Sequence, residues 1–271
     1  MKWIRLVLVV GAMSLLALGV LLWATRPSAH AGSGLVLPAK TPFTKDSYFA
    51  YAQPWGGESN FVLKYWAPYA DSLVLDLKHF PNNTRVHWRW PPVKAGFGPG
   101  VWGYDGVMYG DYDGGIPEQA VKPIRVRDLR ELRQSFAWTL SNTFGSANVL
   151  TEFYLRSDPA DSEAKTLEIG WLLHMPPSTR KFFDKAQQVG VFVDSKGRRW
   201  MVRIADKFCM FAPEKPEDLR AGTIDMQAAL GWLRTKGRVT GDEWVSGAGF
   251  GAEPVAGFGS LTIDRWSIIM R

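Results

Sequence analysis

Cysteine is almost absent from this chain, since Cys209 is the only one among 271 residues. A single cysteine excludes a disulfide framework within the chain. It also leaves no cysteine–histidine cluster of the kind that holds zinc, so we expect no metal site. Because Cys209 lies beside Phe208 and Met210, we interpret it as a small buried hydrophobe rather than a nucleophile.

Uninterrupted runs of basic residues are also missing. The formal net charge of +6 falls to +3 when the three basic residues of the N-terminal segment are set aside. The densest basic stretch, residues 125–133, contains Asp128 and Glu131, and mixed charge of this kind is typical of a solvated face. We therefore expect no nucleic-acid partner.

The N-terminal segment is the longest apolar stretch. Lys2 and Arg5 precede an apolar run over residues 6–24, and the small-residue pattern that ends at Ala31 follows it. This order predicts a secretory signal peptide that is cleaved after Ala31. The run is also long enough to span a bilayer, so an uncleaved membrane anchor is the alternative.

Both interpretations place the folded part outside the cytoplasm, as a secreted or periplasmic protein or as one held at the membrane by its N-terminal segment. We divide the chain into that segment (1–31), a polar linker (32–44) and one folded domain (45–271). No internal repeat or change of composition divides the domain, and we expect a monomer.

Short apolar or alternating runs separated by turn residues recur along the domain and predict strands. We place these strands at residues 48–52, 60–65, 72–77, 84–90, 135–141, 150–156, 166–174, 189–194, 198–205 and 259–270. Only Met226, Ala229, Leu230 and Leu233 show helical spacing. The sequence therefore predicts an all-β fold, an antiparallel sandwich with one short helix.

Glu168 interrupts the apolar run of residues 167–173. In a strand, Leu167, Ile169 and Trp171 share one face with Leu173, while Glu168 faces the opposite side. This pattern predicts a strand with its back to the core and its front to a cleft. An ordinary solvent-facing glutamate on a half-exposed sheet is the alternative.

Tryptophan is abundant, with 13 in the chain, of which Trp3 and Trp23 belong to the N-terminal segment. Aromatic rings stack on the apolar faces of sugars, so this abundance favours a carbohydrate ligand.

The C-terminal third carries a longer pattern: a helix ending before Gly237, a short strand, and Gly-Ala-Glu-Pro-Val-Ala-Gly-Phe-Gly-Ser-Leu at residues 251–261. This pattern resembles glycoside hydrolase family 12, the endoglucanases and xyloglucanases with a β-jelly-roll (concanavalin-like) fold. The resemblance implies that Glu253 is the general acid/base. The resemblance also extends to the segment that begins at Glu168, and it implies that Glu168 is the nucleophile. Glu152, sixteen residues earlier, takes the place of an aspartate that contacts the nucleophile.

Three further residues are candidates for substrate binding. The resemblance aligns Trp55 with a tryptophan that lines a sugar subsite, the alternative being a core tryptophan under a loop. Trp102 follows a glycine-rich loop, where a cleft wall is one interpretation. His174 shares the face of Glu168 at the end of its strand, where it is either a substrate contact or a surface residue.

The chain departs from the family pattern close to the proposed nucleophile. Gly170 stands where the family has methionine, Leu172 stands where it has a cleft tryptophan, and Trp171 is expected to face the core. The resemblance implies a retaining endo-acting hydrolase of β-1,4-linked glucan or a related polysaccharide, which needs no cofactor. The alternative is a non-catalytic, exported glycan-binding protein on the same fold.

Overall fold

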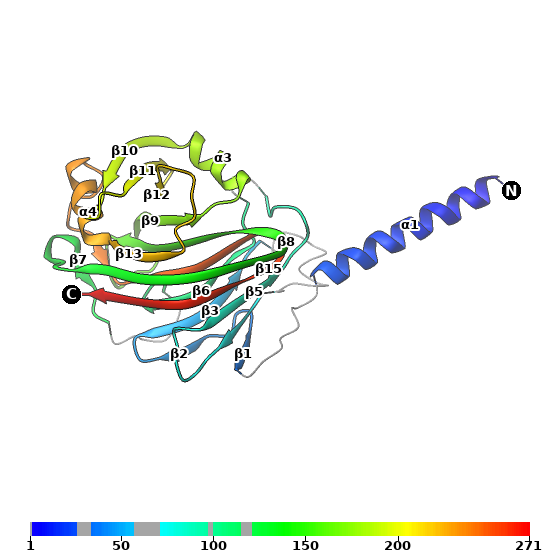
Figure 1. The fold of residues 1–271 in the computed structure, drawn as a ribbon, viewed down its shortest axis with the longest axis horizontal. Coiled ribbons are helices and arrows are strands. Elements are labelled where there is room, and N and C mark those ends of the chain that lie inside the picture. The colour runs from blue at the N-terminus through cyan, green and yellow to red at the C-terminus, as the bar shows by residue number, and fades with distance from the viewer. Residues whose placement is uncertain (1, 26–33, 57–70, 97–99, 115–120) are drawn as a thin grey trace.

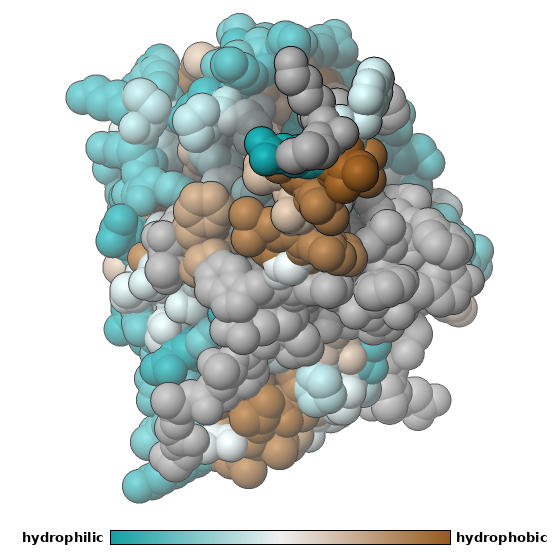
Figure 2. Space-filling model, turned by 90° about the vertical axis from the view of Figure 1, so that its right-hand side faces the viewer, coloured by the Kyte–Doolittle hydropathy of each residue, from teal (hydrophilic) through white to brown (hydrophobic). Residues whose placement is uncertain are grey.

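A computed structural model describes residues 2–25, 34–56, 71–96, 100–114 and 121–271. The strand predicted over residues 60–65 lies outside the described residues. The first element, α1 (Lys2–Thr25), extends away from the domain (Figure 1). Its window Trp3–Val20 is apolar and long enough to cross a membrane, and no part of it is buried. In Figure 2 this helix forms the brown feature that projects toward the viewer.

The domain is built almost entirely from strands, as predicted. They are β1 Leu35–Pro38, β2 Phe43–Lys45, β3 Tyr48–Pro54, β4 Ser72–Leu75, β5 Thr84–Arg89, β6 Gly103–Gly110, β7 Ile124–Arg125, β8 Leu132–Arg156, β9 Lys165–His174, β10 Gln187–Val193, β11 Arg199–Ala205, β12 Phe208–Pro213, β13 Ala221–Asp225, β14 Trp244–Val245 and β15 Gly247–Met270. Strand β1 lies within the predicted linker and pairs with β4, so the folded domain begins earlier than predicted.

Two long strands, β8 and β15, pair antiparallel over nearly their whole length and belong to both layers of the sandwich (Figure 1). The first half of β8 pairs with β13 and the second half with β9. The first half of β15 pairs with β6 and the second half with β5. One layer is thus β1–β4–β5–β15–β8–β13, and the other runs from β2 through β3, β6, β15, β8, β9, β12 and β11 to β10.

One pair of strands departs from the antiparallel expectation. Strands β9 and β12 run parallel, with Phe208 level with Glu168 and Met210 level with Gly170. The segment between them contains α3 and the β10–β11 hairpin, which provides the long crossover that a parallel pair requires.

The main core lies between the layers and contains Trp88, Ile169, Trp171 and Phe250. Trp171 therefore faces the core, as predicted, and its ring stacks on Phe211 with a centroid separation of 4.7 Å. A second cluster, which includes Tyr104, Met108, Leu150, Leu172 and Met210, covers the other face of the second layer. That face carries the site described below.

Within the described part of the domain, two α-helices flank the sheet where one was predicted. The predicted helix is α4 (Met226–Thr235), which the carboxylate of Asp225 caps by accepting a hydrogen bond from the Ala228 N–H at 2.9 Å. The unpredicted helix is α3 (Pro177–Lys185), which buries only Thr179 and Phe183. Its only large apolar residues, Phe182 and Phe183, are adjacent, so they do not give the i, i+3, i+4 apolar spacing that predicts a helix. Its position matters because it brings Thr179 and Phe182 over the face of β9 and β12.

Candidate active site

A cleft of about 240 Å³ opens on the outer face of the second layer. Its lining comes from the end of β3, from β8, β9, α3, β12 and β15. The lining residues are Trp55, Asn148, Glu152, Tyr154, Glu168, Leu172, Thr179, Phe182, Phe208, Met210 and Glu253.

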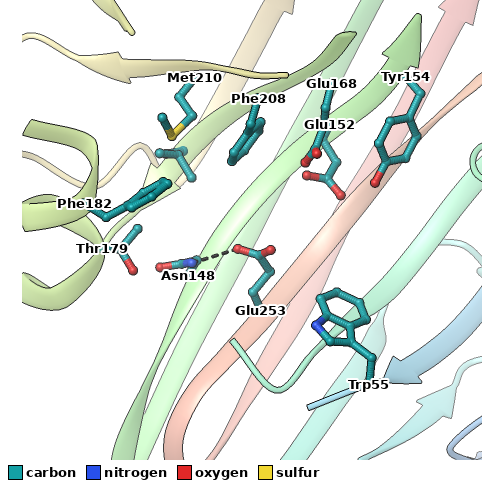
Figure 3. A pocket seen from close by; sticks show the side chains of 11 residues that line it. Trp55, Asn148, Glu152, Tyr154, Glu168, Thr179, Phe182, Phe208, Met210 and Glu253 are labelled. Atoms are coloured by element: carbon teal, nitrogen blue, oxygen red, sulfur yellow. Dashed lines mark hydrogen bonds between the residues drawn. The ribbon is translucent and has the colours of Figure 1, made fainter. Parts of the chain in front are cut away.

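All three glutamates singled out in the sequence lie in this cleft, on the adjacent strands β9, β8 and β15. Glu168 pairs in register with Tyr154, and Glu253 pairs with Asn148, six positions away along β8. This offset puts the two carboxyl groups on opposite walls. Figure 3 shows the carboxyl group of Glu253 facing those of Glu168 and Glu152 across the cleft.

Glu168 and Glu152 are close enough to share a proton, and the causes of their pKa shifts favour keeping it on Glu152. Burial raises the pKa of Glu152 well above its usual range, and the charge of Glu168 raises it further. Burial also raises the pKa of Glu168, to about 7, although the hydrogen bond from Glu152 acts in the opposite direction. Two adjacent buried carboxyl groups cannot both ionise cheaply. Glu168 is therefore the member of the pair that becomes a carboxylate first.

Glu253 has different surroundings, because an amide rather than a carboxyl group contacts it. Burial raises the pKa of Glu253 to about 8, and a hydrogen bond from Asn148 acts in the opposite direction. The Asn148 Nδ2 donates to Glu253 Oε2 at 2.8 Å. Near neutral pH, Glu253 can thus hold a proton while Glu168 is ionised.

Sequence reasoning missed Asn148, although period 2 along β8 places Asn148, Leu150, Glu152 and Tyr154 on one face. It also missed the tyrosines around the acids. Tyr112 donates a hydrogen bond to Glu152 Oε1, and the Tyr112 and Tyr154 rings lie 5.4 Å apart between centroids. These rings shield the carboxyl groups from water, which contributes to their raised pKa values.

Trp55 lines the cleft with 42% of its surface exposed. Its backbone is fixed at the end of β3, because the N–H groups of Trp55 and Gly56 both donate to the carbonyl of Trp102, at 3.0 and 2.8 Å. The N–H of Trp102 donates in turn to the carbonyl of Pro254 at 2.7 Å. A chain of main-chain hydrogen bonds thus links the exposed ring of Trp55 to the residue that follows Glu253.

Trp102 itself does not line the cleft, contrary to our expectation. Only 3% of its surface is exposed, and its ring stacks on Trp90 at 4.8 Å within the main core. Its indole N–H donates to the carbonyl of Val93 at 3.0 Å. A ring buried on both faces has no surface left for a sugar, so its contribution to the site is the backbone that holds Trp55.

His174 lies outside the cleft that holds the glutamates. It lines a neighbouring hollow of about 280 Å³ beside the start of α3, and Leu172 separates the two. The ring Nδ1 of His174 lies 2.7 Å from Asp218 Oδ1. His174 lies at the end of β9, six residues after Glu168, and this distance along the strand places it outside the cleft that holds the carboxyl groups.

The departures from the family pattern have a spatial explanation. A Cβ atom on Gly170 would lie 2.7 Å from Cε2 of Phe208, so the ring of Phe208 occupies the space that a side chain at position 170 would take. Phe208 reaches it from β12, the strand parallel to β9. Leu172 and Met210 line the same side of the cleft.

The geometry offers acid–base and nucleophilic chemistry rather than a metal centre. Among the described residues, no group of three or more histidine, cysteine, aspartate and glutamate side chains is arranged to hold a metal ion. Two carboxyl groups with different protonation states on opposite walls can act on a bond placed between them.

No protein-family model and no curated protein sequence matches the chain, whereas solved structures do. Endoglucanase 3 of Trichoderma harzianum, from glycoside hydrolase family 12, superimposes with a TM-score of 0.67 at 16% identity, covering 90% of this chain and 100% of that one. A family 12 xyloglucanase from Bacillus licheniformis, solved with ligand, gives 0.67 at 17% identity, covering 89% and 100%. The catalytic domain of Humicola grisea Cel12A, solved with a thio cellotetraose, gives 0.64 at 15%, covering 88% and 99%. The chain therefore has the β-jelly-roll fold of these hydrolases, as the resemblance implied.

Proposed function

We propose that the chain is a divergent member of glycoside hydrolase family 12 and a retaining, endo-acting hydrolase of β-1,4-linked glucan or a related polysaccharide. One observation carries the proposal: Glu168 and Glu253 face each other across one cleft, each with partners that set a different protonation state. The activities of the solved structures of the same fold, endoglucanase and xyloglucanase, support this choice of substrate class.

In the first step, the Glu168 carboxylate attacks the anomeric carbon and the glycosidic C–O bond breaks. Glu253 donates its proton to the leaving oxygen, so the leaving group departs as an alcohol. In the second step, the Glu253 carboxylate takes a proton from water, and the water oxygen attacks the anomeric carbon and releases Glu168. Glu152 acts through Glu168: its proton, held by burial, keeps the nucleophile oriented and ionised.

The test is the reaction itself. We expect the wild-type protein to release reducing ends from a soluble β-1,4-glucan, with the β anomer as the first product seen by NMR, because two displacements restore the configuration. An α anomer as first product would contradict the retaining mechanism. Glucan binding without any release would favour the non-catalytic glycan-binding protein.

We expect kcat/KM to follow a bell-shaped pH profile with limbs near pH 7 and pH 8. The rate rises as Glu168, with its pKa raised to about 7, ionises, and it falls as Glu253, with its pKa raised to about 8, loses its proton. In Asn148→Ala the alkaline limb should move to higher pH, because the lost hydrogen bond stabilised the charged form of Glu253. An alkaline limb that moves down, or an acid limb that moves as far, would contradict these assignments.

We also propose that the domain works outside the cytoplasm, because α1 is apolar, exposed and long enough to cross a bilayer. N-terminal sequencing of the exported protein distinguishes the two possibilities. A start at Gly32 supports a cleaved signal peptide, and an intact N-terminus supports a membrane anchor.

A further inference from the structure

Two buried polar atoms in the cleft have no hydrogen-bond partner among the described residues. They are the hydroxyl oxygen of Thr179, on α3, and the amide oxygen of Asn148, on β8, and the two residues are 2% and 1% exposed. Both residues line the cleft that holds the carboxyl groups. A buried polar atom without a partner costs free energy in the folded protein. A ligand that supplies the missing hydrogen bonds removes this cost, so the two atoms indicate a polar ligand group.

The amide of Asn148 is oriented by the candidate proton donor. Its Nδ2 donates to Glu253 Oε2 at 2.8 Å, and Figure 3 shows its oxygen pointing away from Glu253, on the side of Thr179. A hydroxyl group matches this arrangement, because it is both a donor and an acceptor. It can donate its hydrogen to the Asn148 oxygen and accept a hydrogen bond from the Thr179 hydroxyl. One hydroxyl group of a ligand would thus satisfy both atoms.

The position of the pair decides which part of a substrate it meets. Trp55 lies on one side of Glu253, and Asn148 and Thr179 lie on the other (Figure 3). On the proposed function, the sugar that Glu168 attacks stacks on the exposed ring of Trp55, and Glu253 gives its proton to the oxygen of the leaving sugar. The leaving sugar therefore extends from Glu253 toward Asn148 and Thr179.

The surroundings of the pair suit a neutral sugar. Phe182 and Phe208, from α3 and β12, are half-buried residues of the cleft lining. Hydrogen bonds are stronger in such apolar surroundings than in water, and an aromatic ring can contact the C–H face of a sugar. None of the described lining residues is basic, so the site favours a hydroxyl-bearing ligand over an anion.

We propose that Thr179 and Asn148 together bind one hydroxyl group of the leaving sugar, and that Thr179 makes the cleft select a sugar over a leaving group without hydroxyl groups. This inference rests on the proposed function, because the mechanism decides that the sugar bound here is the leaving one. It assigns a substrate contact to α3, the helix that was not predicted from the sequence.

Thr179→Val tests the proposal, because valine has nearly the size of threonine but lacks the hydroxyl. Initial rates are compared on cellotetraose, whose leaving group is a sugar, and on a nitrophenyl cellobioside, whose leaving group brings no further hydroxyl. We expect kcat/KM to fall about tenfold on cellotetraose and much less on the nitrophenyl compound. Thr179→Ser keeps the hydroxyl and should recover most of the loss. Thr235→Val, at an exposed threonine of α4 outside the cleft, is the matched control and should keep both wild-type rates.

Thermal melting distinguishes a binding role of Thr179 from a structural one. Its unpartnered hydroxyl destabilises the fold when no ligand is bound, so Thr179→Val should melt at the wild-type temperature or above it. A lower melting temperature, together with equal losses of kcat/KM on both substrates, would show that the hydroxyl serves the fold and would overturn the proposal.

Calorimetric Kd values for cellotetraose, measured in Glu168→Gln, separate this proposal from the proposed function. If the wild type cleaves no glucan, but adding Thr179→Val to Glu168→Gln weakens cellotetraose binding about tenfold and adding Thr179→Ser does not, the hydroxyl site stands and the hydrolase does not. If Thr179→Val changes neither this Kd nor kcat/KM on cellotetraose, only water occupies the site and the proposal is overturned.

Discussion

Glu168→Gln is expected to lower kcat on soluble glucan by a factor of about 10⁴ or more, because an amide cannot form the covalent intermediate. KM should change little, since glutamine keeps the shape of the side chain. Glu163→Gln, an exposed glutamate in a turn, is the control and should keep full activity. Initial rates of reducing-end release measure both variants.

Stability distinguishes a lost nucleophile from a damaged fold. The pKa of Glu168 is raised by burial to about 7, so its ionisation destabilises the folded state as pH rises from the unfolded pKa through 7. Glu168→Gln removes that cost, and its melting temperature at pH 8 should equal or exceed that of the wild type. In Glu168→Ala, added azide should restore turnover and give a glycosyl azide of inverted configuration. A variant that melts much earlier, or that retains activity, would contradict the assignment.

Glu253→Ala is expected to lower kcat on glucan by a factor of about 10²–10⁴, the range for a general acid. The loss in the first step should be much smaller for a nitrophenyl cellobioside, because its leaving group departs without a proton. The alkaline limb of the pH profile should also disappear, since Glu253 no longer titrates. Stopped-flow rates of nitrophenol release and steady-state rates on glucan measure the two effects.

Asn148, on the strand next to that of Glu253, provides a matched control for Glu253→Ala. Asn148→Ala removes the hydrogen bond to Glu253 but leaves the proton donor in place, so it should shift the alkaline limb without removing it. Equal losses in Glu253→Ala on both substrate types, or an alkaline limb that persists unchanged, would show that another group donates the proton.

Local patterns were enough to predict the strand of Glu168 and its two faces. Because side chains alternate along a strand, Ile169 and Trp171 face the core and Glu168 faces the opposite side, and this follows from the segment alone. Helix α4 could also be predicted from the sequence, because its apolar spacing and its Asp225 cap both lie within one short segment. The expectation that Glu168 and Glu253 act together came from the resemblance, because no local pattern relates two residues so far apart in the sequence.

Contacts between distant segments could not be predicted in this way. The burial of Trp102 depends on Trp90, which stacks on it from a separate strand. The role of Gly170 depends on Phe208, which reaches it from β12 across a parallel pairing that no alternation pattern signals. In both cases the deciding partner lies far away in the sequence. Helix α3 was missed for a local reason, because its two large apolar residues, Phe182 and Phe183, are adjacent rather than at helical spacing.

The hydrogen bonds that run from Trp55 through Trp102 to Pro254 join main-chain atoms only. The spacing between Trp55 and Glu253, the sugar platform and proton donor of the proposed function, is therefore fixed by the backbone, and exchanging side chains along this path does not lengthen or shorten it. Substitutions can change the side chains that contact a bound sugar. On the proposed function, they cannot as easily change the number of sugar units between Trp55 and the bond that is cut. On the proposed function, the main chain therefore sets the length of the product.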